Sequence, residues 1–295
     1  MSDHWDSQWR KNREKISTLG GVPRDFRRTE LVANIEPTGS GPERLERCCD
    51  LAGVDELLRC DTLVGDPSPT YKFWRRGQWV TQLSLRHAYF AQTIVSFLNG
   101  ERGALTILEI GAGYGGLSAT LVRALNVTTY VFVDAEPCLE LQRKFTSEAL
   151  DPDMTRTVFL TPGSEWKEVP DLIVNTHSFA EMDHVDVERY FAQIQDILPE
   201  EGALFSVNLL RWRVSSFHEY PFDEFWRHEV LRLSRCDSRY VESLSVRDYS
   251  ARSPHPRLFF RDEVCYGRRF SNREYSRDRQ RPRAMERCAG RPNTS

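Results

Sequence analysis

The 295-residue sequence predicts an α/β fold with a doubly wound, mainly parallel sheet. Three observations favour this class. From residue 105 onward, apolar runs of strand length alternate with segments of helical periodicity. A glycine-rich turn directly follows the first of these runs, and an acidic residue closes the second. Together they indicate a Rossmann-like nucleoside-binding domain, preceded by a region of different character.

The N-terminal region, residues 1–100, is expected to form a helical cap or lid. Residues 2–19 and 43–58 place apolar side chains at helical spacing, and breaks rich in glycine and proline separate them. Ser84 is expected to cap a third helix, which Gly100 ends.

Residues 101–270 are expected to form the cofactor domain. Apolar runs predict strands at 105–110, 130–133, 157–160, 171–175 and 203–209. Helices are predicted at 116–125, from Pro137 onward, and at 185–198. Segments 240–246 and 257–264 suit an antiparallel hairpin that closes the sheet, and the aromatic-rich stretch 211–225 suits an insertion beside the active site.

Net charge, apolar runs and cysteine spacing argue against several classes of function. A net charge of −3 gives no general attraction to nucleic acid or membranes, and no apolar run is long enough for a signal core or a membrane span. We therefore expect a cytoplasmic protein. Seven scattered cysteines without a C-x-x-C pair favour neither a disulfide framework nor a zinc site.

The C-terminal tail, residues 271–295, is predicted to be disordered, because it contains seven arginines and little apolar surface. A role in nucleic-acid binding is the weaker alternative, since Tyr275 is its only aromatic residue.

The first strand and its turn carry the clearest functional pattern. Residues 107–116 read Ile-Leu-Glu-Ile-Gly-Ala-Gly-Tyr-Gly-Gly. Where Cβ atoms are missing, a ligand can approach the backbone closely. Asp134 ends the second strand, where nucleoside sites place an acid for the ribose diol. The residues that we expect to bind the cofactor here are Glu109, Gly111, Ala112, Gly113, Tyr114, Gly115 and Asp134.

The identity of the cofactor depends on Glu109, because the glycines also satisfy the dinucleotide fingerprint G-x-G-x-x-G. A carboxylate beside the turn would repel a pyrophosphate, whereas it suits the cationic methionine end of S-adenosylmethionine (SAM). The pattern E-x-G-x-G-x-G, followed by an acid after the next strand, is the signature of class I SAM-dependent methyltransferases. A dinucleotide site and a tight turn without any ligand remain the alternatives.

The end of the fourth strand adds a second motif. Residues 171–182 read Asp-Leu-Ile-Val-Asn-Thr-His-Ser-Phe-Ala-Glu-Met. With the glycine motif and Asp134, this stretch resembles a family of sugar O-methyltransferases, a branch of the class I enzymes, over residues 60–210. The resemblance implies SAM as cofactor and a small, carbohydrate-containing acceptor. Asn175, at the carboxyl end of its strand, is expected to lie at the cofactor.

Methyl transfer to a sugar hydroxyl needs a base, because such a hydroxyl is about as weakly acidic as water, with a pKa of roughly 15.7. His177 is the first candidate, since an imidazole titrates near neutrality. Glu181 and Asp183 are candidates to orient it or to bind sugar hydroxyls. The alternatives are that all three only cap or begin the next helix. Likewise, Tyr114 either covers the cofactor or packs on the following helix.

Other functions remain open at this stage. No histidine pair has metal-ligand spacing, so we expect no metal, with magnesium at Glu181 and Asp183 as the weaker alternative. One rival function is an RNA or protein methyltransferase that docks through the basic tail. Another is a SAM-binding scaffold without catalysis. A homo-oligomer is compatible with the sequence.

Overall fold

A computed structural model provides the structure. It describes residues 3–29, 31, 57–58, 64–66, 71–73, 78–98, 103–199, 202–209, 230–237 and 240–246. The insertion at 211–225, the strand at 257–264, the tail at 271–295 and all but the last two residues of the helix at 43–58 were predicted from sequence and lie outside the described residues.

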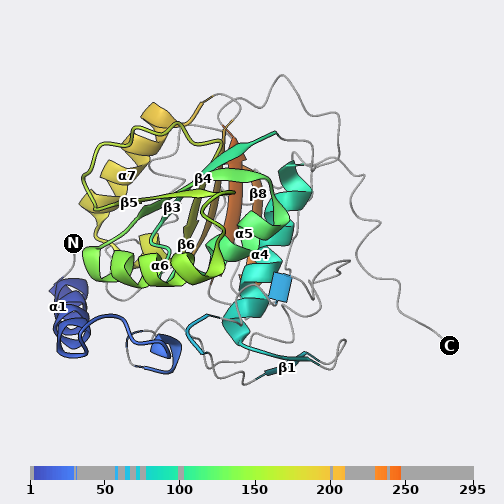
Figure 1. Ribbon diagram of the computed structural model, residues 1–295. Helices are drawn as coiled ribbons and strands as arrows, with labels where there is room; N and C mark the ends of the chain where they lie inside the picture. Colours follow the sequence, from blue (N-terminus) through green and yellow to red (C-terminus); the bar gives the residue numbers. More distant parts are fainter. Residues whose placement is uncertain are drawn as a thin grey trace.

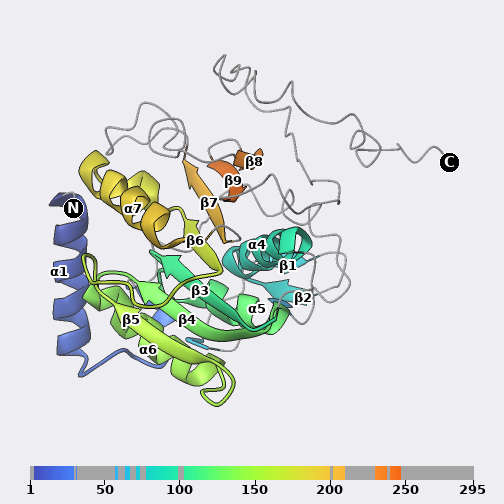
Figure 2. The same cartoon turned by 90° about the horizontal axis from the view of Figure 1, so that it is seen from above.

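The core of the fold is a seven-stranded sheet in the order β5-β4-β3-β6-β7-β9-β8. Its strands are β3 (Leu105–Ile110), β4 (Val127–Val133), β5 (Arg156–Leu160), β6 (Leu172–Thr176), β7 (Ala203–Leu209), β8 (Val230–Asp237) and β9 (Tyr240–Val246). The first five in this spatial order pair in parallel, whereas β9 pairs antiparallel with both β7 and β8. Figure 2 shows the strands in this sequence across the sheet.

Helices cover both faces of the sheet (Figures 1 and 2), as a doubly wound fold requires. The helices α4 (Gln82–Leu98), α5 (Gly116–Ala124) and α6 (Glu136–Ala149) lie on one face, and α7 (His184–Ile197) lies on the other. The predicted α/β class is therefore confirmed. The predicted hairpin of 240–246 with 257–264 is wrong in its partner, because β9 lies between β7 and β8 and both of its edges are already paired.

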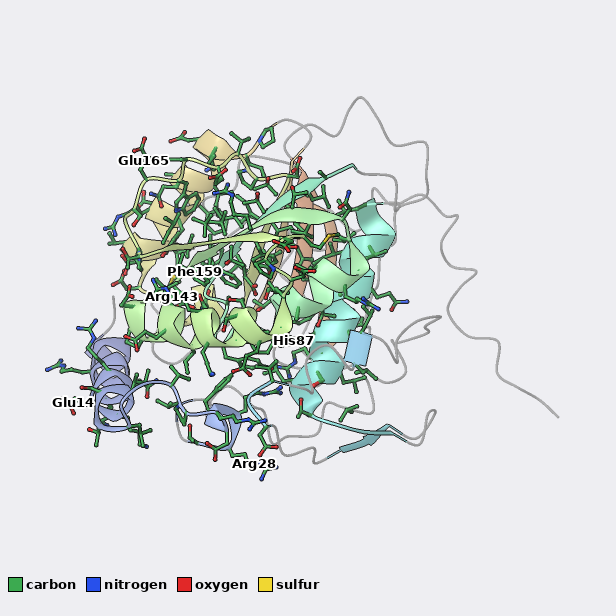
Figure 3. The ribbon with its side chains drawn as sticks, in the orientation of Figure 1. Glu14, Arg28, His87, Arg143, Phe159 and Glu165 are labelled. Carbon is green, nitrogen blue, oxygen red and sulfur yellow. The ribbon has the colours of Figure 1, made fainter. Side chains whose placement is uncertain are left out.

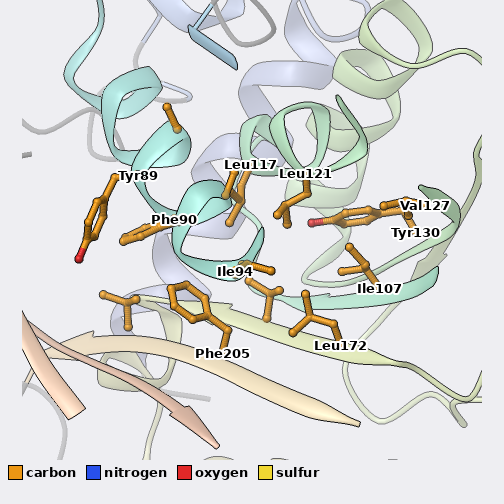
Figure 4. Close-up of a cluster of buried hydrophobic side chains, with 14 of the residues drawn as sticks. Tyr89, Phe90, Ile94, Ile107, Leu117, Leu121, Val127, Tyr130, Leu172 and Phe205 are labelled. Atoms are coloured by element: carbon orange, nitrogen blue, oxygen red, sulfur yellow. The ribbon is translucent and has the colours of Figure 1, made fainter. Parts of the chain in front are cut away.

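Side chains of each strand alternate between two apolar clusters. Ile107 joins Phe90 and Leu121 under α4 and α5 (Figure 4), whereas Leu108 and Ile110 face α7. This period of two follows from the pleat of a strand. Because each central strand is covered on both faces, its sequence is an almost continuous apolar run.

The N-terminal region is not purely helical. It contains α1 (Asp3–Thr18), which contacts α6, a short 3-10 turn η1 (Phe26–Arg28), and a hairpin of β1 (Tyr71–Phe73) and β2 (Gln78–Val80). The helix predicted from Ser84 begins two residues earlier, because the hydroxyl of Thr81 accepts from the Ser84 N–H at 3.0 Å and serves as the cap. The apolar face of α4 packs on the sheet, so this helix belongs to the covering layer of the cofactor domain.

Two further contacts fix the outer elements. Arg143 of α6 lies over the ring of Phe159 on β5, 5.1 Å from its centre (Figure 3). A third apolar cluster joins Phe26 and Leu31 of the N-terminal region to α5 and α6. In the part of the chain that the structure describes, no helix has the length and apolar character needed to cross a membrane.

Candidate functional site

The glycine turn after β3 adopts backbone conformations that favour glycine. Gly111, Gly113 and Gly115 have φ angles of 71°, 62° and 94°, in the left-handed region that other residues rarely enter. The turn leads directly into α5, whose N-terminal N–H groups point toward the carboxyl edge of the sheet. Gly111, Ala112 and Gly113 are only half-buried, so the first part of the turn is accessible to a ligand.

The space beside Gly111 is occupied by the chain itself. A Cβ at this position would collide with the side chain of Ser178, which follows β6. The missing Cβ of Gly111 therefore makes room for a neighbouring loop, and not for the ligand that the sequence led us to expect there.

Asn175 secures this contact between the two loops. Its Nδ2 donates to the carbonyl of Ile110 at 3.0 Å and to Oγ of Ser178 at 2.5 Å. Oγ of Ser178 in turn donates to the same Ile110 carbonyl at 3.1 Å. The side chain of Asn175 is completely buried. The side chain of Asn175 thus supports the turn from below, and its contact with the cofactor stays a prediction.

Asp134 lies beside the glycine turn, as predicted. Its Oδ1 accepts from the N–H of Ala135 and its Oδ2 from Nε2 of Gln142, both at 2.8 Å. The same Nε2 donates to the carbonyl of Gly113 at 3.0 Å, so one amide joins the acid to the turn. Burial raises the pKa of Asp134 to about 6, against the opposing effect of these hydrogen bonds. The structure therefore brings together the two halves of the predicted nucleoside site.

Glu109 lies beneath the turn and is 1% exposed. The hydroxyl of Tyr130 donates to its Oε2 at 2.6 Å. Burial raises the pKa of Glu109 to about 7, and the charge of Asp134 adds to this shift. This pKa lies near neutral pH. The charge of a nearby ligand can therefore shift Glu109 toward its ionised or its protonated form.

The side chain of Tyr114 packs inside the protein, which is one of the two roles considered from the sequence. Its ring is 1% exposed and lies 5.2 Å from Phe145 and 6.0 Å from Phe26, measured between ring centres. Cζ of Arg27 stands 4.7 Å from the centre of the same ring. The side chain of Tyr114 therefore belongs to the third apolar cluster and does not cover the site, although its backbone remains part of the turn.

His177 lies at the carboxyl edge of β6, with a φ of 71°. Its backbone N–H donates to the carbonyl of Val207 at 2.6 Å. Its ring nitrogen Nε2 lies 3.4 Å from Nη1 of Arg86 on α4. A guanidinium can only donate, so Nε2 accepts and the imidazole proton sits on Nδ1.

The environment of His177 keeps the ring uncharged. Burial is the main cause that lowers its pKa well below the usual 6.5, and the positive charges of Arg86 and His87 lower it further. His87, labelled in Figure 3, extends from α4 and lies with its ring centre 6.2 Å from that of Tyr114.

Asp183 caps a helix. Its Oδ1 accepts from the Asp186 N–H at 2.9 Å at the start of α7, and this hydrogen bond lowers the pKa of the Asp183 carboxyl. Glu181 ends the short 3-10 helix η2 (Ser178–Glu181), and its side chain lies outside the described residues. Among the described residues, no group of three or more histidine, cysteine and acidic side chains is placed to hold a metal ion.

Three residues of the site received no role from the sequence: Tyr130, Gln142 and Arg86. Tyr130 and Gln142 sit at ordinary strand and helix positions, where an aromatic or an amide side chain carries no functional signal. Arg86 precedes a histidine on an amphipathic helix, where a solvent-exposed role is the usual interpretation.

Comparisons with known proteins find structural similarity but no match to a family model or to a curated sequence. Similar solved structures include an O-methyltransferase family 2 protein from Planctomyces limnophilus in complex with apigenin, with 16% identity and a TM-score of 0.43 over 56% of this chain. An O-methyltransferase family protein from Burkholderia thailandensis matches at 15% identity and a TM-score of 0.41 over 57% of this chain.

A third similar structure is the glycopeptide N-methyltransferase MtfA with SAM, at 14% identity and a TM-score of 0.42. That match covers 53% of this chain and 93% of MtfA. The chain spans 59% and 61% of the length of the Planctomyces and Burkholderia proteins, respectively.

Proposed function

We propose that this chain binds SAM at the carboxyl edge of β3 and β4 and transfers its methyl group to a hydroxyl. The proposal rests on one arrangement, in which Glu109, the glycine turn and Asp134 meet at that edge and Gln142 joins the turn to the acid. In doubly wound sheets, ligands bind outside the carboxyl ends of the strands where the strand order reverses. Here the order reverses at β3, between β4 and β6.

The strand order of the sheet favours SAM over a dinucleotide as the ligand. Dinucleotide-binding sheets follow the order 3-2-1-4-5-6. In this chain an antiparallel strand, β9, lies between β7 and β8 at the end of the sheet.

Glu109 supports the same choice. A sulfonium or ammonium group nearby favours its ionised form, whereas a pyrophosphate would force a proton onto it. The N-terminal end of α5 suits the carboxylate of the methionine end.

His177 is the residue that we propose as the base. SAM supplies an electrophilic methyl group on a positively charged sulfur. The imidazole of His177 is uncharged at physiological pH and lies at the edge of β6, next to the turn. To take the proton of a hydroxyl, its Nε2 must exchange the contact with Arg86 for one with the acceptor. Asp183 is already used as a helix cap, which leaves His177 as the better placed group.

For the acceptor, the resemblance to sugar O-methyltransferases supports a hydroxyl of a sugar or of a glycosylated small molecule. A SAM-binding protein without turnover is a second candidate, and the contact between Arg86 and Nε2 of His177 favours it, because that contact occupies the lone pair that a base would use.

The test has two stages. Isothermal titration calorimetry with SAM, S-adenosylhomocysteine and NAD should detect the first two and not NAD. Transfer of a radiolabelled methyl group is then measured on a panel of sugars, glycosides and phenols. Tight NAD binding without a response to SAM contradicts the proposal. SAM binding without transfer to any member of the panel favours the second candidate.

A further inference from the structure

The side chain of Gln142 has features that helix packing does not explain. It lies in the middle of α6 and is completely buried. A Cβ added to Gly115 would lie 3.6 Å from its Cγ, so its stem passes beside the far end of the glycine turn. Its amide reaches past this point to the carbonyl of Gly113 and to Asp134. One side chain therefore hydrogen-bonds both the glycine turn and the acid after β4.

The orientation of this amide is fixed by its partners. A carbonyl and a carboxylate only accept, so the NH₂ group of Gln142 must face both. Its Oε1 then points away, and no donor within the described part of the chain reaches it. A buried acceptor without a partner lowers stability, and an apolar side chain of the same length would avoid that cost. The amide is thus explained by what it does to Asp134 and not by packing.

Resting on the proposed SAM site, we propose that Gln142 is a positioning residue that locks the Asp134 carboxylate to the glycine turn in the geometry that binds the ribose. Its hydrogen bond also helps to keep that carboxylate ionised, since it opposes the effect of burial. An ionised carboxylate is the stronger acceptor for a ribose diol. Gln142 therefore extends to lower pH the range over which the site binds its cofactor.

Other groups around Asp134 also influence its charge. Among the described residues they are Glu109 on β3, Cys138 on α6 and Tyr190 on α7. Glu109 and Asp134 repel each other when both are ionised, whereas the Cys138 thiol donates to Asp134. None of these three joins the acid to the turn. The backbone N–H groups of Gly113 and Ala135 also hydrogen-bond the Asp134 carboxylate, and the first of these belongs to the turn. Because they are backbone donors, replacing the Gln142 side chain leaves them in place and separates its effect from theirs.

The experiment compares Gln142→Met, Gln142→Glu and a control, Thr146→Val, in the full chain. Methionine keeps the length and helix preference of glutamine and removes its donors. Thr146 is buried one turn further along α6, and its hydroxyl donates to the Gln142 carbonyl without reaching Asp134. Carboxyl-carbon NMR measures the pKa of Asp134 without ligand, and calorimetry measures the Kd for SAM from pH 5.5 to 8.5.

We expect Gln142→Met to raise the pKa of Asp134 and weaken SAM binding about tenfold at pH 7.5, the loss expected for one charge-assisted hydrogen bond. Gln142→Glu should bind most weakly at high pH and recover as the new carboxyl gains a proton and can donate. Thr146→Val should bind like the wild type. A double-mutant cycle with Asp134→Asn should show the two positions to be coupled.

An unchanged Asp134 pKa together with an unchanged pH profile for SAM in Gln142→Met overturns this inference. If that variant does not fold, the pH-dependent recovery of Gln142→Glu decides, and its absence overturns the inference as well. Failure of the wild type to bind SAM at any pH counts instead against the proposed function, while the NMR comparison still tests the link between Gln142 and Asp134.

Discussion

Two regions at the carboxyl edge of the sheet use their polar groups in opposite ways. In the first region, where β3 and β4 end, Gly111, Gly113 and Asp134 are half-buried. The pKa values of Glu109 and Asp134 are raised to about 7 and about 6. In the second region, at and after the end of β6, the polar side chains bond other parts of the protein. Asn175 supports the glycine turn and Asp183 caps α7. Destabilised acids at an accessible edge are typical of ligand sites, whereas satisfied side chains are typical of a scaffold.

Residues of the two sequence motifs therefore have different roles in the structure. The polar side chains of Asn175 and Ser178 in the second motif hold the first motif in place, whereas His177 contacts Arg86 of α4. The cofactor half is therefore the better supported part of the proposed function, and the acceptor half depends on a single residue.

The largest expected effect concerns His177. Replacement by Asn, which tolerates the left-handed backbone at this position, should lower turnover by about 10²- to 10⁴-fold while leaving the Kd for SAM unchanged. Because burial lowers the pKa of His177, the wild-type kcat at saturating SAM should show no inflection near pH 6.5. Stopped assays across pH with the identified acceptor measure both. Unimpaired turnover would mean that His177 has a structural role only.

The contact between the two loops can be tested at Gly111. Gly111→Ala should lower the free energy of unfolding by about 2–4 kcal/mol, from the left-handed backbone and from the collision with Ser178. The double variant with Ser178→Gly should recover part of this loss, because it removes the atoms that collide. Gly103→Ala is the matched control, since its added Cβ would meet nothing within 4 Å. Denaturant unfolding that shows equal stability for all three variants would mean that the loops do not interlock.

The raised pKa of Glu109 predicts a stability cost without ligand. The unfolded chain loses this proton near pH 4.5 and the folded chain near 7, so the free energy of unfolding falls by about 3 kcal/mol as the pH rises between these values. Glu109→Gln should remove this slope and be more stable than the wild type at pH 8, while binding SAM less tightly. Thermal unfolding from pH 5 to 8 measures the slope, and a slope that persists in the variant would assign it to other groups such as Asp134.

The smallest effect is expected at Asp183. Loss of the cap in Asp183→Ala should cost about 1 kcal/mol of stability, with turnover and SAM affinity within error of the wild type. Chemical denaturation and the methyl-transfer assay report these separately. A large loss of turnover in a folded variant would return Asp183 to the list of candidate bases or acceptor ligands.

Sequence alone predicts the parts of this fold whose signals are local. The boundaries of β3, β7 and β9 follow directly from apolar runs, and glycine and acid patterns locate the turn and Asp134. The three-residue strands β1 and β2 and the polar strand β8 carry too few apolar residues to be recognised before their pairing partners are known.

The supporting residues could not be predicted, because their roles depend on contacts between distant segments. Gln142 and Asp134 are eight positions apart on a strand end and a helix, and only the packing of α6 brings them together. Ser178 and Gly111 are separated by three strands, two helices and their loops. Asn175 has the motif position of a ligand residue and the environment of a core residue, which only burial distinguishes.

Proton release on SAM binding shows directly whether the ligand acts on Glu109 and Asp134. At pH 6.5 Glu109 is mostly protonated without ligand, and Asp134 partly so. A cation near the turn and a ribose diol on the acid both favour the ionised forms. Calorimetry in two buffers of different ionisation enthalpy should therefore detect a net release approaching about one proton per SAM, reduced in Glu109→Gln. Proton uptake on binding, or binding of NAD in place of SAM, would contradict the account.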